Sequence, residues 1–324
     1  MNQNVADITV IIPYYNEEKT ILTTLRLVTS QTLMPKEVFL VNSSSSDGTS
    51  KIINKWINKN QQSFSTKFRN LFEGTTNPAC SKNLGICRAQ TEWVAFMDCR
   101  LIFPVNWLEL QFKFVLTNKL SVVSGVVYLE GENSIDRAAV AQTYGYQKKR
   151  ACVPSSLVKK EVFAQTGLFL KKRRAGYDIA WVLLLRKLNI KRGINKEMVV
   201  VYNGINFGKN LKQVYKKSVL YALPTLGTRL YLIPYYYLAL LLISILLCLI
   251  YPQTIGLLFI GYIFVRGIVV PTIKGNYIQL LKDDFSQVYW LLLVGLVMDF
   301  GRSLGVTLGF VKYHLGLDLY NEKS

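Results

Sequence analysis

The sequence predicts an α/β protein with a mostly parallel sheet flanked by helices, followed by an all-α membrane region. Two observations predict this. Short apolar, β-branched runs alternate with helical patterns up to about residue 202. Three long apolar runs then follow beyond residue 230, in a chain with 50% hydrophobic and only 18% charged residues. We expect an α/β domain over residues 1–208, a basic amphipathic segment over 209–231 and a membrane region over 232–324.

In the first part, strands and helices are expected to alternate because each apolar run is followed by a polar turn and then a helical period. Strands are predicted at 8–13, 37–42, 68–73, 94–97, 121–129 and 198–202, and helices at 20–30, 51–60, 78–89, 106–116, 159–165 and 179–188. Residues 130–152 show no such period, and we predict a long polar loop there.

The strand predicted at 94–97 organises the domain. It is apolar throughout, which is typical of a strand buried on both faces of a parallel sheet, and it ends in Asp98, Cys99 and Arg100. Open α/β sheets bind their ligands at the carboxyl ends of the strands. An acid at such an end usually meets a metal or a phosphate-bearing ligand, so we expect the functional site at Asp98.

Five short motifs occur along this domain in a recognisable order. They are IIPYYNEE, VNSSSSDGT, SKNLGICRA, FMDCR and AGYDIAW. Together they resemble a family 2 glycosyltransferase with the GT-A fold, a Rossmann-like sheet flanked by helices, over about residues 6–205. The resemblance implies that a nucleotide-diphosphate sugar donor binds at the carboxyl edge of the sheet. The donor-binding positions that it implies are Pro13, Tyr15, Asn16, Glu17, Asn42, Asp47, Lys82, Asn83, Asp98 and Arg100.

The metal site of the family is degenerate in this chain. Where the family has D-x-D, this chain has Asp98-Cys99-Arg100, and Asn203 stands where many members have a histidine. Two interpretations stay open. Arg100 substitutes for the charge of a metal, while Asp98 orients the sugar or Arg100 itself. Alternatively, Asp98 alone binds a hydrated ion held chiefly by the diphosphate. The sequence therefore assigns no cofactor firmly. The cofactor considered is Mg²⁺ or Mn²⁺, with a weak requirement.

The catalytic base implied by the resemblance is Asp178, the second acid of the family's Glu-Asp pair, whereas Tyr177 occupies the glutamate position. A carboxylate there implies an inverting single displacement. The Q-x-x-R-W motif of processive members is absent, which favours transfer of one sugar per encounter, to a lipid-linked or glycan acceptor of the cell envelope. The alternative function is a catalytically silent GT-A-like module that binds nucleotide sugars or acts as a scaffold at the membrane.

Membrane spans are predicted at about 233–251, 254–271 and 288–311, with the last of these open to an interfacial placement. The basic segment before them is expected to lie on anionic lipids. Arg266 is expected to snorkel to the interface, and Asp299 to form a local ion pair with Arg302. The G-x-x-x-G spacings of Gly301, Gly305 and Gly309 suggest helix packing or a homodimer.

Composition limits the other possibilities. The net charge of +19 attracts anions, but no nucleic-acid-reading motif accompanies it, so we expect no nucleic-acid partner. The five scattered cysteines and the single histidine make a zinc site improbable. The start of the chain has no apolar signal segment, and basic residues precede the first predicted span. We expect an integral membrane protein whose catalytic domain faces the cytoplasm.

Overall fold

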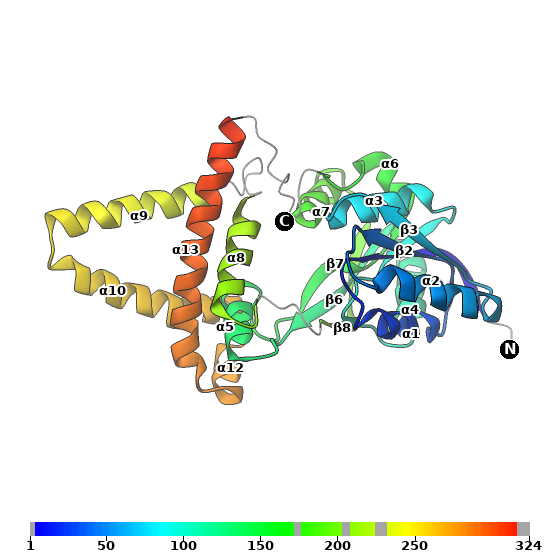
Figure 1. Ribbon diagram of the computed structural model, residues 1–324, viewed down its shortest axis with the longest axis horizontal. Helices are drawn as coiled ribbons and strands as arrows, with labels where there is room; N and C mark the ends of the chain where they lie inside the picture. The colour runs from blue at the N-terminus through cyan, green and yellow to red at the C-terminus, as the bar shows by residue number, and fades with distance from the viewer. Residues whose placement is uncertain (1–3, 172–175, 203–207, 224–231, 316–324) are drawn as a thin grey trace. The chain divides into compact units, whose positions relative to one another are not determined.

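The computed structural model describes residues 4–171, 176–202, 208–223 and 232–315 (Figure 1). The chain divides into two compact units. The first consists of Met1–Tyr128 and Lys149–Tyr202, and the second of Leu129–Lys148 and Asn203–Ser324. The second unit thus includes a segment, Leu129–Lys148, that the sequence analysis placed within the α/β domain.

The first unit is built on an eight-stranded sheet with the order β3-β2-β1-β4-β7-β6-β8-β5. The strands are β1 (Val5–Tyr14), β2 (Met34–Ser43), β3 (Lys67–Glu73), β4 (Trp93–Phe96), β5 (Leu101–Ile102), β6 (Val122–Leu129), β7 (Arg150–Lys159) and β8 (Arg192–Tyr202). The pairs β1–β2, β1–β4 and β2–β3 are parallel, whereas β4–β7, β6–β7 and β5–β8 are antiparallel. The predicted α/β sheet is confirmed, as a mixed sheet with a parallel half.

Helices cover both faces of this sheet. They are α1 (Ile21–Thr29), α2 (Thr49–Asn60), α3 (Pro78–Arg88), α4 (Trp107–Thr117), α6 (Val162–Thr166) and α7 (Tyr177–Lys187). Alternate residues of β1 point to opposite faces: Val10 joins a core with α1, α2 and α4, and Ile11 joins a second core with α3, α6 and α7. The parallel strands are therefore buried on both sides, as their continuous apolar sequence predicts.

The polar loop predicted at 130–152 is wrong. Helix α5 (Ser134–Thr143) lies within it, and β7 begins at Arg150. The Asn133 side chain accepts a hydrogen bond from Asp136 N, so it caps α5. Strand β7 was missed because Pro154 interrupts it. The register of β7 on β6 shifts between the Ser124–Ser156 and Gly125–Cys152 pairs, and this bulge accommodates the proline. The helix predicted at 159–165 begins only at Val162.

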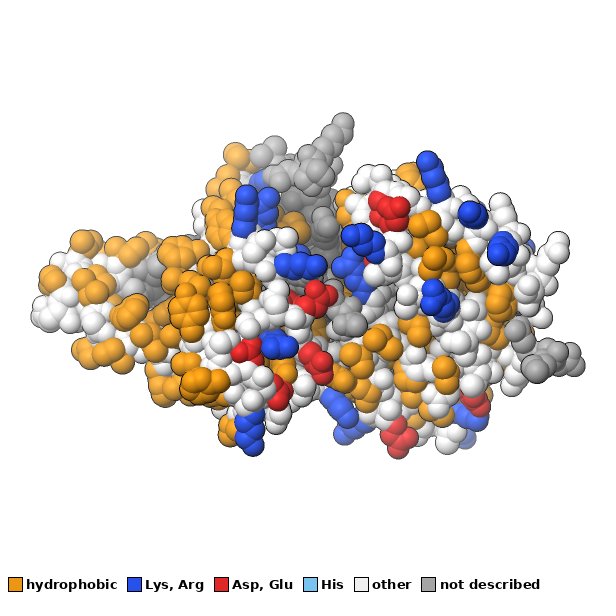
Figure 2. Space-filling model, turned by 60° about the horizontal axis from the view of Figure 1, so that its bottom comes forward, with side chains coloured by type: hydrophobic (Ala, Val, Ile, Leu, Met, Phe, Trp, Pro, Cys, Tyr) orange, Lys and Arg blue, Asp and Glu red, His pale blue; other side chains and the backbone are white. Residues whose placement is uncertain are grey.

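The second unit is helical. Its helices are α5, α8 (Leu211–Ala222), α9 (Leu232–Ile250), α10 (Thr254–Phe264), the π-helical turn η4 (Val265–Val269), α11 (Val270–Lys274), α12 (Tyr277–Asp283) and α13 (Gln287–His314). Among the described residues, Thr254–Lys274 and Gln287–Lys312 are long and apolar enough to cross a membrane. Hydrophobic side chains dominate the surface around α10 (Figure 2). The first predicted span coincides with α9, although the side chains of 231–238 lie outside the described set.

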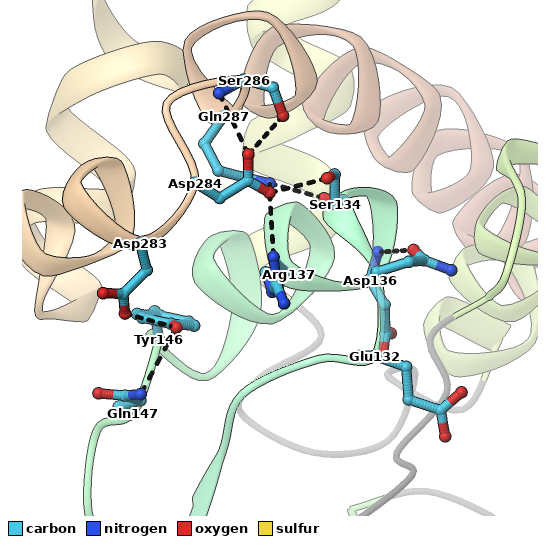
Figure 3. Close-up of polar contacts among 11 residues, drawn as sticks. Glu132, Ser134, Asp136, Arg137, Tyr146, Gln147, Asp283, Asp284, Ser286 and Gln287 are labelled. Carbon is cyan, nitrogen blue, oxygen red and sulfur yellow. Dashed lines mark hydrogen bonds and ion pairs between the residues drawn. The ribbon is translucent and has the colours of Figure 1, made fainter.

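Helix α5 is fixed to the α12–α13 turn by polar contacts (Figure 3). Asp284 accepts hydrogen bonds from Ser134 Oγ at 2.7 Å and from Gln287 Nε2 at 2.9 Å, and its carboxylate lies 3.2 Å from Arg137. Burial alone would raise the pKa of Asp284, but the hydrogen bonds of its hydroxyl and amide partners outweigh burial and hold the pKa well below its usual value. Segment Leu129–Lys148 therefore belongs to the helical unit by specific contacts.

The charged residues of the two long apolar helical segments pair differently from the prediction. Arg266 is buried and does not snorkel, and its Nε lies 2.7 Å from Asp299 Oδ2, with a second ion pair between the same two side chains. Gln142 of α5 accepts from Arg266 Nη1 at 3.1 Å, and Tyr262 donates to Asp299. The expected pairing of Asp299 within its own helix is thus replaced by a bridge between helices. A buried charge needs such a partner because hydrocarbon cannot solvate it.

The glycine face of α13 packs inside the chain. A Cβ atom at Gly301 would lie 2.7 Å from Ser218 Cβ, and one at Gly305 would lie 2.8 Å from Ala222 Cβ, both on α8. Helix α8 thus uses its buried face on α13, while its exposed face carries Lys212 and Lys216. The predicted homodimer face is therefore already covered at these two glycines, because small residues let α8 approach closely.

Candidate active site

Three loops meet the sheet at the carboxyl ends of its parallel strands. In each loop a non-glycine residue has a left-handed backbone: Asn16 after β1 (φ 53°), Ser44 after β2 (φ 60°) and Arg100 after β4 (φ 66°). This conformation is costly for residues with a Cβ atom, and it clusters at functional sites. Since β1 pairs in parallel with both β2 and β4, the three loops lie at one edge of the sheet.

The first two loops hold each other through paired hydrogen bonds. Asn16 N donates to Ser45 Oγ at 3.1 Å, and Ser46 N donates back to Asn16 Oδ1 at 2.9 Å. Glu17 N donates to Thr49 Oγ1 at 2.9 Å. The polar SSSSDGT turn is therefore a structural clamp on the YNEE loop, and it fixes the backbone at Asn16 and Glu17.

Several predicted donor-binding residues stabilise this edge of the sheet. Asn42 is buried and accepts from Ser45 N at 2.8 Å, and Asp47 accepts from Thr49 and from Glu18 N at 3.1 Å. These hydrogen bonds outweigh burial and lower the pKa of Asp47. The Pro13 carbonyl accepts from Cys99 Sγ at 3.6 Å.

Tyr15 is the exposed member of the first loop, with 40% of its surface accessible. A base or ribose can therefore reach its ring. Its donor-binding role, like those of the other predicted positions, stays a prediction.

Lys82 on α3 is buried against Asp98. Its Nζ lies 2.8 Å from Asp98 Oδ1 and 3.1 Å from Oδ2, and it donates to Tyr177 Oη at 3.1 Å. None of the Lys82 side chain is exposed, compared with 21% of the Asp98 side chain. Burial alone would lower the pKa of Lys82, but the Asp98 charge and the two hydrogen bonds raise it above its usual value. Lys82 is therefore a permanent cation beside Asp98.

Close packing places this lysine. Gly85, one turn after Lys82, lets α3 approach β1, since a Cβ atom there would lie 2.6 Å from Ile11 Cγ2. Asn83 is also buried, and its side chain makes two hydrogen bonds with the Phe169 backbone, at 2.8 and 3.0 Å. The amide of Asn83 thus holds α3 to the segment before α7.

Arg100 pairs with Glu17 instead of Asp98. The Nε atom lies 2.9 Å from Glu17 Oε2, and 40% of the arginine side chain is exposed. Burial would lower the pKa of Arg100, but the Glu17 hydrogen bond raises it. Within the described part of the chain, this guanidinium contacts Glu17 through Nε. Its two terminal nitrogens make no hydrogen bond or ion pair with the described residues, so they can serve as donors to a ligand. One interpretation of the sequence expected Asp98 to orient the sugar or Arg100. The structure shows that Glu17, and not Asp98, contacts Arg100.

Asp178 lies in the first turn of α7, and the residue before the helix is Gly176, which has φ 73°. Asp178 is partly exposed and accepts from Ile179 N at 2.9 Å. The helix dipole favours a carboxylate at this end. Burial raises the pKa of Tyr177 to about 12, and the charges of Asp98 and Asp178 add to this effect. Asp178 directly follows Tyr177 in the chain, and Lys82 Nζ contacts both Asp98 and Tyr177 Oη.

No role was predicted for Tyr177 or Cys152. The structure places Tyr177 Oη 3.1 Å from Lys82 Nζ, which also pairs with Asp98. Burial raises the pKa of Cys152 to about 12. Tyr177 could have been found from its position beside Asp178, whereas Cys152 lay in the segment predicted to be a loop.

The donor set at Asp98 does not fit a protein-held metal. Among the described residues, no three His, Cys, Asp or Glu side chains gather closely enough to hold an ion. Lys82 Nζ donates to Asp98 Oδ2 and lies 2.8 Å from Oδ1, which is buried and accepts no hydrogen bond from the described residues. Asn203, the residue at the family's histidine position, lies outside the described residues. Mg²⁺ and Mn²⁺ want several oxygen ligands, which these residues do not supply.

The sequence profile described as Glycosyl transferase family 2 matches residues 9–171, just over half of the 324 residues. The chain belongs to this family. An uncharacterised glycosyltransferase of Rickettsia bellii is 27% identical over 201 residues, covering 60% of this chain and 28% of that protein. A UDP-Glc:α-D-GlcNAc-diphosphoundecaprenol β-1,3-glucosyltransferase of Escherichia coli is 27% identical over 142 residues, covering 44% of this chain and 54% of its own length. This chain thus matches about half or less of the length of each of these two relatives.

The fold of this family 2 glycosyltransferase is also found in solved structures. A mannosyltransferase of Pyrobaculum calidifontis, in complex with GDP-mannose and Mn²⁺, aligns with a TM-score of 0.52 and 15% identity. The alignment covers 96% of this chain and 87% of that one. The likeness shows that the fold is GT-A-like.

Proposed function

We propose that this glycosyltransferase is membrane-anchored and inverting, and that it moves one sugar from a nucleotide-diphosphate donor to a lipid-linked or glycan acceptor. Asp178 is the proposed general base. The donor is proposed to bind along the loops after β1, β2 and β4. Tyr15, Asn16 and Glu17 would face the nucleotide, and Asp98 and Arg100 would face the diphosphate.

One observation carries this proposal: Lys82 Nζ lies 2.8 Å from Asp98 and 3.1 Å from Tyr177 Oη, and Asp178 directly follows Tyr177 at the start of α7. A carboxylate at the strand end and a second one at a helix start therefore share one site. Asp178 is partly exposed, so an acceptor hydroxyl can reach it. The two carboxylates have different surroundings, since Lys82 neutralises Asp98 whereas Asp178 accepts only from the Ile179 amide among the described residues.

The proposed reaction is a single displacement. The acceptor oxygen bonds to the anomeric carbon, the bond from that carbon to the diphosphate oxygen breaks, and Asp178 takes the acceptor proton. The diphosphate leaves with the electron pair of the broken bond. Arg100, which is 40% exposed on its side chain, is the described cation best placed to stabilise that leaving charge.

The membrane anchor supports a lipid-linked acceptor. Only 11% of the apolar window in Thr254–Lys274 is buried within the chain, whereas the core helix of a water-soluble protein is mostly buried. The Escherichia coli relative acts, by its name, on a sugar diphosphoundecaprenol. Lys212 and Lys216 on α8 are exposed, which suits contact with anionic headgroups and supports the proposal that the catalytic unit faces the cytoplasm.

The test of the base is Asp178→Asn. The amide retains an oxygen for the Ile179 amide, so the helix start keeps its hydrogen bond, but it cannot accept the acceptor proton. We expect turnover to fall by roughly 10² to 10⁴, measured as nucleoside diphosphate release from a donor panel in the presence of polyprenyl-linked sugars. Donor binding, measured by calorimetry, should change little.

Asp7→Asn is the matched control, because Asp7 is exposed and, among the residues that the structure describes, pairs with Lys36 and the Glu92 backbone amide. It should leave turnover unchanged. Full activity in Asp178→Asn would contradict the assignment of the base. Donor binding without turnover in the unaltered protein would instead support the silent-module alternative.

A further inference from the structure

Lys82 pairs with Asp98, but the proposed transfer mechanism gives Lys82 itself no contact with the donor. The ammonium lies within 3.1 Å of both carboxylate oxygens and of Tyr177 Oη, and its side chain is fully buried. The Tyr177 ring lies beside it, with its centroid 5.6 Å from Nζ. A donor in solvent cannot touch Lys82 in this arrangement, whereas it can reach Asp98, whose side chain is 21% exposed. Lys82 therefore acts on a ligand through Asp98.

We propose that Lys82 is the built-in cation of the donor site: it occupies the position at Asp98 that a divalent metal would otherwise take, and nucleoside diphosphate binds without a protein-held metal. This inference rests on the proposed function for its ligand class. Arg100 is then the exposed positive group for the diphosphate, while Lys82 cancels the Asp98 charge that would repel it.

The energetics favour the lysine over an ion. A metal at Asp98 would have to displace an ammonium that has no other acid partner among the described residues and no exposure to water. A buried charge that loses its partner is strongly destabilised. Mg²⁺ and Mn²⁺ also need further oxygen ligands, and no cluster of three acidic, histidine or cysteine side chains exists in the described ranges.

Packing prevents Lys82 from moving aside. It extends from α3, which is held by the Asn77 cap, the close approach at Gly85 and the two Asn83 hydrogen bonds. The ammonium is therefore part of the rigid second core rather than a surface side chain that a metal could push into solvent.

The test removes the charge but keeps the polar contacts. Lys82→Gln retains donor and acceptor atoms for Asp98 and Tyr177, and Lys159→Met is a matched control, since Lys159 pairs with the carboxylates of Glu92 and Glu161. Mn²⁺ binding is measured by electron paramagnetic resonance without nucleotide. UDP and GDP binding is measured by calorimetry in EDTA and in Mn²⁺. Circular dichroism checks that each variant is folded.

In the unaltered protein and in Lys159→Met we expect no stoichiometric Mn²⁺ binding, and diphosphate affinities that agree within about twofold between EDTA and Mn²⁺. In Lys82→Gln, Asp98 loses the positive charge that neutralises it, so we expect Mn²⁺ affinity to rise roughly tenfold and diphosphate affinity in EDTA to fall roughly tenfold, with recovery in Mn²⁺. Loss of both effects in Lys82→Gln/Asp98→Asn would assign them to Asp98.

Two results would overturn the inference: Mn²⁺ binding by the unaltered protein that Asp98→Asn abolishes, or loss of its diphosphate binding in EDTA. A folded Lys82→Gln that gains no Mn²⁺ affinity would do the same. If Lys82→Gln does not fold, the titrations of the unaltered protein and of Asp98→Asn still decide. The Mn²⁺ measurement needs no nucleotide, so absence of any UDP or GDP binding would count against the proposed function and would leave this test standing.

Discussion

The bridge between Arg266 and Asp299 should be a main determinant of stability in the helical unit. Arg266 is 5% exposed, and it joins two long apolar helical segments through Nε at 2.7 Å and through a second ion pair with Asp299. Its Nη1 also donates to Gln142 of α5 at 3.1 Å. Arg266→Met leaves the Asp299 carboxylate without its cation. Removal of one partner of a buried pair costs about 3–5 kcal/mol, which in a chain of this size lowers Tm by roughly 6–20 °C.

The control is Tyr262→Phe, which removes the 3.1 Å hydrogen bond from the tyrosine hydroxyl to the same carboxylate. That change should cost about 1 kcal/mol and lower Tm by roughly 2–4 °C. The double variant Arg266→Met/Asp299→Leu replaces the pair by apolar groups and should recover most of the loss. Thermal unfolding in one detergent, followed by circular dichroism, compares all four proteins. A loss in Arg266→Met no larger than that in Tyr262→Phe, or strict additivity in the double variant, would refute this reasoning.

Two further predictions concern Arg100 and the orientation of the chain. Arg100→Gly and Arg100→Ala both lose the Glu17 pair and should both weaken UDP binding, but only glycine relieves the φ of 66°, so the glycine variant should be more stable by about 1 kcal/mol in thermal unfolding. Equal stability would mean that the loop is not strained. Cys87 is exposed on α3, so a membrane-impermeant maleimide should label it in lysed but not in intact cells if the catalytic unit faces the cytoplasm. Labelling in intact cells would reverse the orientation.

The parallel half of the sheet could be predicted because its strands are buried on both faces. Their continuous apolar runs indicate buried strands, and the polar turn after each strand marks the edge of the sheet where ligands bind. The antiparallel half of the sheet could be predicted less completely. Pro154 and the two serines after it hide β7, and the two-residue strand β5 is too short to give a pattern. Helix α5 did have signals, the Asn133 cap and the alanines after it, which the basic residues that follow obscured.

The candidate site was located by its motifs, but the pairing of its charges was not. Lys82 and Asp98 are 16 positions apart, and Arg100 and Glu17 are 83 apart. Which cation meets which acid depends on how closely α3 packs on β1, and this in turn depends on the missing Cβ atom of Gly85. The same applies to Arg266 and Asp299, which lie on different helices. Local spacing suggested the wrong partner there, because a nearby charge in sequence is not always the nearest in space.

The most direct test of the central claim is product analysis by mass spectrometry. The full chain in detergent would be offered a panel of UDP- and GDP-sugars with polyprenyl-linked acceptors, in parallel with Asp178→Asn. The account predicts one added sugar per acceptor, one nucleoside diphosphate released per transfer, and inverted anomeric configuration in the product. Donor that binds but is never consumed, or turnover that is unchanged in Asp178→Asn, would contradict it.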